Sequence, residues 1–261
     1  MKRLVRVAAR RLREYISGVS VATPHVAGPT PEALIEAATF LFRQFDAPTF
    51  ERFRLEFLTN DVFFDLLNHR FLEHRKRRHP LGSDTGYVGK FEYLYLVVRA
   101  MRPNLVVETG VFDGISSSVI LQALQDANAG KLVSVDLPAT NVVAGSTDRM
   151  GYSSLPNGCR PGWVIPDYLR SRHELILDDS RTALPSIFET HGYADLFFHD
   201  SLHTFDHQYF EYNLAWAHLH EDGILASDDI TWNNAFSQFC SERRKRYVQV
   251  RGMGAVRKET S

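Results

Sequence analysis

Acidic residues and glycines follow the first two predicted strands at spacings that could hold a nucleotide-like ligand. An apolar run at 105–107 predicts a buried parallel strand, and it leads through Glu108 into a turn with Gly110 and Gly114 and then into a helix. Glycines let the backbone approach a ligand closely, and the start of a helix offers N–H groups to polar ligand atoms. The next strand ends at Asp136, whose carboxylate could accept both hydroxyls of a ribose. The pattern predicts an adenosine-containing ligand.

The spacing within this turn separates two classes of adenosine ligand. Residues 108–114 read E-T-G-V-F-D-G and lack the middle glycine of the dinucleotide fingerprint G-x-G-x-x-G, so a pyrophosphate is poorly accommodated. An acid ahead of the turn would repel a phosphate and attract a cationic head, such as the ammonium of a methionine moiety. The turn resembles motif I of the class I S-adenosylmethionine-dependent methyltransferases. Together with the ribose acid, the residues assigned to S-adenosylmethionine are Glu108, Gly110, Asp113, Gly114 and Asp136.

Three further acids follow two later strands of the predicted sheet. Asp200 comes directly after a strand at 195–199, and Asp228 and Asp229 follow a strand at 224–227. The carboxyl ends of parallel strands lie at the same edge of a sheet, so these carboxylates should meet beside the adenosine ligand. Gathering three acids without a cation raises their pKa values, whereas Mg²⁺ is satisfied by carboxylate oxygens and water. The sequence therefore predicts a magnesium site formed by these acids.

Motifs beyond the turn extend the resemblance over residues 85–240. They look like a bacterial branch of the class I methyltransferases that includes metal-dependent sugar and natural-product O-methyltransferases. These motifs are Gly162–Pro166, Leu177–Ser180, His199–Thr204 and Ser227–Asp229. In the metal-dependent relatives, acids at the positions of Asp200, Asp228 and Asp229 hold magnesium, and a lysine three residues past the first acid accepts the proton. His203 occupies the lysine position and suits the same task, with a structural role as the alternative.

The chain between the third and fifth predicted strands completes the expected site. The resemblance implies adenine contacts from Asp179 and Ser180, which follow the third strand. Aromatic residues recur at helical spacing from Phe205 to Leu219, and this stripe indicates a helix packed on the sheet. The histidines outside the stripe, which we expect on the surface, are His207, His218 and His220.

Length and composition indicate one α/β domain with an appendage. The chain has 261 residues, of which 44% are hydrophobic, and predicted strands alternate with helices from 105 onwards. We expect a Rossmann-like, doubly wound, mostly parallel sheet with helices on both faces, in a domain spanning 81–261. Residues 1–80 read as an N-terminal helical cap. The two cysteines cannot form a disulfide framework, which favours a cytoplasmic protein.

The charge pattern bears on the partners of the chain. The formal net charge is −1, and the window 195–229 holds eight acids without a lysine or arginine, which argues against a nucleic-acid partner. Six basic residues within the first 13 could contact an anionic membrane surface weakly, or they could belong to a solvated helix. The sequence is also compatible with a homo-oligomer.

Together these patterns predict an S-adenosylmethionine-dependent, magnesium-assisted O-methyltransferase in which Asp200 and His203 are catalytic. The expected acceptor is a hydroxyl of a sugar or a small secondary metabolite. Alternatives are a hydroxylase-like member of the same group and a non-catalytic cofactor-binding or scaffold protein. An iron-dependent hydroxylase would need two histidines and one carboxylate at its metal, and the acid-rich set suits magnesium better. A nicotinamide-dependent oxidoreductase is disfavoured by the missing glycine.

Overall fold

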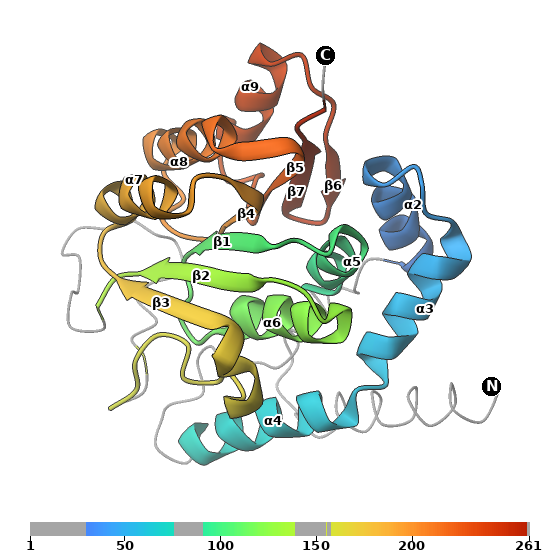
Figure 1. Ribbon diagram of the computed structural model, residues 1–261, viewed down its shortest axis with the longest axis vertical. Helices are drawn as coiled ribbons and strands as arrows, with labels where there is room; N and C mark the ends of the chain where they lie inside the picture. Colours follow the sequence, from blue (N-terminus) through green and yellow to red (C-terminus); the bar gives the residue numbers. More distant parts are fainter. Residues whose placement is uncertain (1–29, 76–90, 139–154, 156–157, 260–261) are drawn as a thin grey trace.

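The computed structural model describes residues 30–75, 91–138, 155 and 158–259 (Figure 1). Within these residues one sheet is flanked by helices. The helices are α2 (Pro31–Leu41), α3 (Ala47–Leu58), α4 (Asp61–Arg75), α5 (Glu92–Met101), α6 (Ile115–Ala127), the 3₁₀ helix η2 (Asp167–Arg172), α7 (Ser180–His191), α8 (Phe205–Ala217) and α9 (Ala235–Glu242). The strands are β1 (Leu105–Thr109), β2 (Lys131–Asp136), β3 (His173–Leu177), β4 (Ala194–His199), β5 (Leu219–Ser227), β6 (Val248–Val250) and β7 (Met253–Arg257).

The seven strands that the described residues form are ordered β3-β2-β1-β4-β5-β7-β6. β1 pairs in parallel with β2 on one side and with β4 on the other, and β5 runs parallel to β4. β7 is antiparallel to both of its neighbours. The strand order reverses between β1 and β4, because the sheet grows from β1 first toward β3 and then toward β6. In open α/β sheets a ligand lies beyond the carboxyl ends of the strands at such a reversal.

Both faces of the sheet are covered, because successive strand residues point to opposite sides. On β1, Val106 belongs to the apolar cluster that includes α5 and α6, whereas Val107 belongs to the cluster that includes α7, α8 and α9. On β4, Phe198 likewise belongs to the first cluster and Phe197 to the second. Figure 1 shows α7 and α8 on one side of the sheet and α5 and α6 on the other. The expected doubly wound, mostly parallel α/β fold is confirmed.

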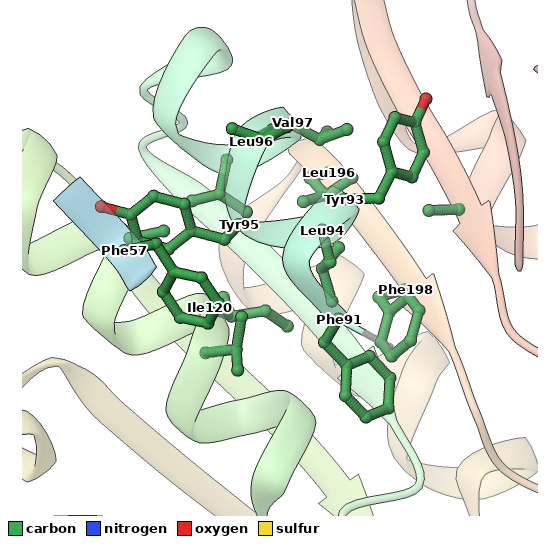
Figure 2. Packing of buried hydrophobic residues seen from close by; sticks show 14 of the residues in the cluster. Phe57, Phe91, Tyr93, Leu94, Tyr95, Leu96, Val97, Ile120, Leu196 and Phe198 are labelled. Carbon is green, nitrogen blue, oxygen red and sulfur yellow. The ribbon is translucent and has the colours of Figure 1, made fainter. Parts of the chain in front are cut away.

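Helix α5 is buried on nearly all sides, because it lies between the sheet and the N-terminal helices. Tyr95 of α5 stacks on Phe57 of α3 with ring centroids 4.5 Å apart, and Phe91 meets Phe198 of β4 edge to face (Figure 2). The N-terminal helices and the sheet therefore share one hydrophobic core. The predicted domain boundary at 80/81 and the basic residues before 14 lie outside the described residues. No helix in the described part of the chain is long and apolar enough to cross a bilayer.

Candidate functional site

The turn after β1 lies directly against the loop after β4. Gly110 adopts a φ of +84°, and a Cβ built on it would lie 2.1 Å from the carbonyl oxygen of Asp200. The backbone N–H of Asp200 donates to the carbonyl oxygen of Thr109 at 2.8 Å and closes the junction. Glycine suits this position, because it tolerates positive φ and leaves room for a backbone neighbour. Two residues singled out from the sequence are thus neighbours at the strand-order reversal.

Glu108 lies beneath this turn rather than at its surface. Its side chain is 0% exposed, and its oxygens accept hydrogen bonds from the hydroxyls of Ser116, Ser117 and Ser134 at 2.6–2.7 Å. Burial raises the pKa of Glu108 to about 7, although the three hydroxyls act to lower it. In this position Glu108 joins the start of α6 to β1 and β2. Its contact with a cofactor ammonium stays a prediction, since the carboxylate and its three serine partners are all buried.

The segment 162–165 packs over the same turn and holds it in place. Asp113 is buried and accepts a hydrogen bond from the indole N–H of Trp163 at 2.5 Å. The N–H of Gly162 donates to a carbonyl oxygen of the turn at 2.9 Å. A Cβ on Gly114 would lie 2.7 Å from the Cα of Gly162, so the close approach depends on a glycine. Asp113 therefore braces the turn, and its contact with the cofactor stays a prediction.

Asp136 ends β2 beside the turn. One of its carboxylate oxygens accepts the backbone N–H groups of Val111 and Phe112 at 2.9 and 2.6 Å, and the other accepts that of Leu137 at 2.7 Å. Burial raises the pKa of Asp136, and the three N–H groups oppose that rise. The side chain is half-buried, and a carboxylate offers about four acceptor sites, so that one remains for a ribose hydroxyl.

Asp179 and Ser180 follow β3 at the start of α7. Asp179 is exposed, and its carboxylate caps the helix by accepting the N–H of Arg181 at 2.7 Å. Ser180 is 8% exposed, and its hydroxyl lies 3.1 Å from Nε2 of His207 in the interior. Asp179 is the more accessible of the two residues predicted to contact adenine, and both contacts stay predictions.

Asp200 and Asp229 approach each other across His203. The ring nitrogen Nε2 of His203 lies 3.7 Å from Oδ1 of Asp200 and 3.9 Å from Oδ2 of Asp229. The His203 side chain is 9% exposed, whereas those of the two acids are 24% and 23% exposed. β4 and β5 are neighbours in the sheet, and this brings the three residues to one place. A histidine between two carboxylates could accept a proton from a hydroxyl bound at this edge.

Asp228 is held apart from this group by burial. Its side chain is 0% exposed, and its Oδ1 accepts the N–H of Asp229 at 2.9 Å. The N–H of Asp228 donates to the carbonyl oxygen of His199, which ties the loop after β5 to the end of β4. Among the described residues, no three His, Cys, Asp or Glu side chains form a group that could hold a metal ion. Asp228 orders the turn that presents Asp229, and its role as a third metal ligand stays a prediction.

A buried carboxylate that the sequence analysis missed lies behind the site. Glu211 of α8 is 0% exposed, and it accepts hydrogen bonds from the Thr109 hydroxyl at 2.6 Å and the Ser201 hydroxyl at 3.0 Å. Nδ1 of His199 lies 2.7 Å and Nε2 of His207 2.8 Å from its oxygens. His207 is only 8% exposed, so its expected surface position is wrong, because Glu211 gives it a buried partner. The i,i+4 spacing of His207 and Glu211 was the available signal.

Large apolar side chains are exposed along the same edge of the sheet. Among the described residues seven are more than a third exposed, and four of them lie at or just past the carboxyl end of a strand, namely Phe112, Leu177, Leu202 and Trp232. Trp232 is 40% exposed, and its ring centroid lies 4.9 Å from that of His203. Exposed apolar surface beside polar groups marks a ligand site. Trp232 is thus a further candidate for contact with a ligand. In the sequence its only signal is its position shortly after Asp228 and Asp229.

Comparisons with known proteins show what the domain around this site is similar to. The family described as "Methyltransferase domain" matches residues 107–230. The O-methyltransferase TomG from Streptomyces achromogenes, solved with S-adenosylmethionine, is 14% identical with a TM-score of 0.51, and the match covers 75% of this chain and 90% of TomG. Cofactor-bound Rv0187 from MTB is 12% identical with a TM-score of 0.50, covering 78% and 92%. No curated protein matches the chain. At these identities the structures share the fold, and residues 107–230, from β1 to Ile230, match a methyltransferase domain of the class I, S-adenosylmethionine-dependent kind.

Proposed function

We propose that this methyltransferase transfers the methyl group of S-adenosylmethionine to a hydroxyl of a sugar or small secondary metabolite, assisted by a divalent ion, Mg²⁺. The observation that carries the proposal is the position of His203 between Asp200 and Asp229, at the strand-order reversal. A proton acceptor flanked by carboxylates suits a hydroxyl, because the oxygen must lose its proton as it attacks the methyl group. TomG, which shares the fold, is an O-methyltransferase involved in tomaymycin synthesis, in agreement with this class of reaction.

S-adenosylmethionine is proposed to lie over the turn between β1 and α6. Gly110 and Gly114 let this turn pack closely against the backbone of Asp200 and Gly162. Asp136 is the acid best placed for the ribose, because it is half-buried at the end of β2 and already oriented by backbone N–H groups. Asp179 is an exposed acid after β3, on the proposed adenine side. Glu108 supports the turn from below through its three serine partners.

Asp200 and Asp229 are the residues proposed to hold the divalent ion. Both side chains are partly exposed and face the same histidine. Mg²⁺ usually binds proteins through one or two carboxylates and keeps several waters, so two acids form a sufficient set of donors. When bound, the ion would lower the pKa of an acceptor hydroxyl and offset the negative charge of the acids. Asp228 would keep Asp229 in place through the hydrogen bond between them.

His203 is the proposed proton acceptor, and its Nε2 atom faces the two carboxylates. The imidazole would take the proton of the acceptor hydroxyl, and S-adenosylmethionine, when bound, would supply the methyl group and keep the electron pair of its carbon–sulfur bond. The main requirement on the protein is then alignment of the oxygen with that bond. Asn233 donates from Nδ2 to the carbonyl oxygen of His203 at 3.0 Å and steadies the backbone behind the ring.

The acceptor is proposed to lie against Trp232 and Leu202. Both side chains are 40% exposed, and they flank His203 at the end of the sheet where the acids converge. An aromatic face beside a proton acceptor and two carboxylates fits a small molecule with an apolar ring face and hydroxyl groups at its rim.

The proposal is tested first by binding and then by turnover. Titration calorimetry should show binding of S-adenosylmethionine and none of NAD. Release of S-adenosylhomocysteine is then measured over a panel of sugars and phenolic hydroxyl compounds, with Mg²⁺ or with excess chelator. Asp200→Ala should lower metal-dependent turnover about 100-fold or more and leave cofactor affinity within about threefold.

The matched control for this variant is Asp206→Ala, which removes an exposed acid in the first turn of α8. Unchanged turnover in Asp200→Ala, or in excess chelator, would remove the ion from the mechanism. Cofactor binding without methyl transfer to any member of the panel would favour the scaffold alternative.

A further inference from the structure

The buried carboxylate of Glu211 connects the two halves of the site. Two of its four donors come from residues next to proposed site residues: Thr109 precedes Gly110 of the cofactor turn, and Ser201 follows Asp200. The other two donors are His199, at the end of β4, and His207, one turn earlier on α8. One side chain thus holds β1, β4, the loop after β4 and α8 together.

Glu211 is ionised in this environment. Burial by itself would raise the pKa of Glu211, but the charges and hydrogen bonds of His199 and His207 outweigh that effect and hold the pKa below its usual range. A buried carboxylate is expensive to place unless all its oxygens are paired. Helix α8 does not need it for docking, because Tyr212 and its aromatic neighbours on α9 already pack the helix into the core.

The bonds to Glu211 fix how the two loops sit relative to each other. The N–H of Asp200 donates to the carbonyl oxygen of Thr109, so backbone and side-chain bonds join the same two segments. A third connection runs through His207, whose Nε2 lies 3.1 Å from the hydroxyl of Ser180 at the start of α7. Loss of the carboxylate would leave two hydroxyls and two imidazoles without their common acceptor.

We propose that Glu211 is a positioning residue for methyl transfer, which fixes Asp200 and His203 relative to the cofactor turn. This inference rests on the proposed function for its catalytic consequence, but the geometric part stands on the four hydrogen bonds alone. Misplacement of reacting groups by about 1 Å can cost about 100-fold in rate. Glu211 would therefore affect turnover without touching cofactor or acceptor.

The experiment compares Glu211→Gln with the unchanged chain in two measurements. Hydrogen exchange of the full chain without ligand should show amides at 109–110 and 199–203 exchanging about tenfold faster, because the amide of glutamine cannot accept all four donors. At saturating S-adenosylmethionine kcat should fall about 10- to 100-fold, whereas the cofactor Kd and the acceptor KM stay within about threefold. Glu211→Asp, which keeps the charge, should recover part of kcat.

The matched control is Glu92→Gln, because Glu92 is also a buried carboxylate but pairs with Nε of Arg54 in α3 at 2.7 Å. It should lose thermal stability without faster exchange at 199–203 and without loss of kcat. The proposal is overturned if Glu211→Gln exchanges like Glu92→Gln at these amides, or if its kcat is unchanged. If the unchanged chain transfers no methyl group, the proposed function fails, and the exchange data alone decide whether Glu211 positions the loop.

Discussion

The proposed cofactor half and the proposed acceptor half of the site are built in different ways. The cofactor half, residues 108–114 with Asp136 and 162–165, is held by backbone hydrogen bonds and by glycines in close contact. The acceptor half, residues 200–203 and 228–232, presents side chains from two separate loops, and several of them are partly exposed. The first half is a fixed surface, whereas the second is a set of side chains that a ligand can still contact.

This difference suggests how the two halves divide their work. A cofactor common to a large family can be held by backbone geometry, which depends little on side-chain identity. An acceptor specific to one enzyme must be read by side chains, which can change without disturbing the fold. Changes in the cofactor half should therefore affect folding and cofactor affinity, and changes in the acceptor half should affect turnover and acceptor affinity.

The largest effect is expected where the two halves meet, at Gly110. Gly110→Ala places a methyl group 2.1 Å from the carbonyl oxygen of Asp200 at a φ of +84°, so the junction must open. We expect a loss of about 4 kcal/mol or more in unfolding free energy, or no folded protein, measured by denaturant titration.

Gly192→Ala is the matched control for this substitution. Gly192 also has a positive φ, +77°, but no atom lies within 4 Å of a Cβ built there, so it isolates backbone strain from the clash. The strain alone should cost about 1–3 kcal/mol. Equal losses in the two variants would show that the contact between the halves contributes nothing to stability.

The second prediction concerns the buried acid of the cofactor half. The pKa of Glu108 is raised from 4.5 to about 7, so the unfolded chain loses this proton first as the pH rises. The contribution of Glu108 to the free energy of unfolding is therefore complete below pH 4.5. It is lost as the pH rises through 7, a change on the order of 3 kcal/mol. Glu108→Gln should remove this dependence.

Denaturant titrations from pH 5 to about 9 on both proteins measure the difference, in which the other titrating groups cancel. As the pH rises, the unfolding free energy of Glu108→Gln should increase relative to that of the unchanged chain. A constant difference across that range would mean that Glu108 ionises in the folded protein as it does in water.

The sequence predicted the local structure of the cofactor half, because its pattern is local. The turn from Glu108 to Gly114 spans seven residues, and its strand, glycines and helix start are each recognisable from neighbours in the chain. The convergence of Asp200 and Asp229 followed from one topological rule, that parallel strands end at the same edge. The observed β5 begins five residues earlier than predicted, because the polar residues 220–222 interrupt the apolar pattern.

What the sequence could not predict depends on contacts between distant residues. Glu211 bonds to Thr109, 102 positions away, and its i,i+4 spacing from His207 is the one local feature that distinguishes it from an acid on a solvated helix face. Glu108 is buried and bonded to Ser134 of β2, 26 positions away. Charge alone predicts that Glu108 contacts a ligand, whereas its carboxylate lies inside the protein. Periodicity identifies a helix face, but the partner that buries a polar residue comes from another element.

The smallest effect is expected at Trp232, which tests whether the acceptor half reads its ligand through side chains. Trp232→Ala removes a 40% exposed ring beside His203 and leaves the backbone of the loop in place. We expect the acceptor KM to rise about 3- to 30-fold, a loss of about 1–2 kcal/mol, with kcat and cofactor Kd little changed. Steady-state kinetics at saturating S-adenosylmethionine measure it, and Trp232→Phe should keep part of the affinity.

Tyr193→Ala is the control for Trp232→Ala, because Tyr193 is a 53% exposed aromatic residue just before β4, at the opposite end of that strand. A rise in KM for phenolic acceptors alone would mean that the Trp232 ring binds flat aromatic substrates. A rise that extends to sugars would mean that it binds any apolar ring face. If KM is unchanged for every acceptor while kcat falls, the ring acts by holding His203, and the acceptor is bound by other residues.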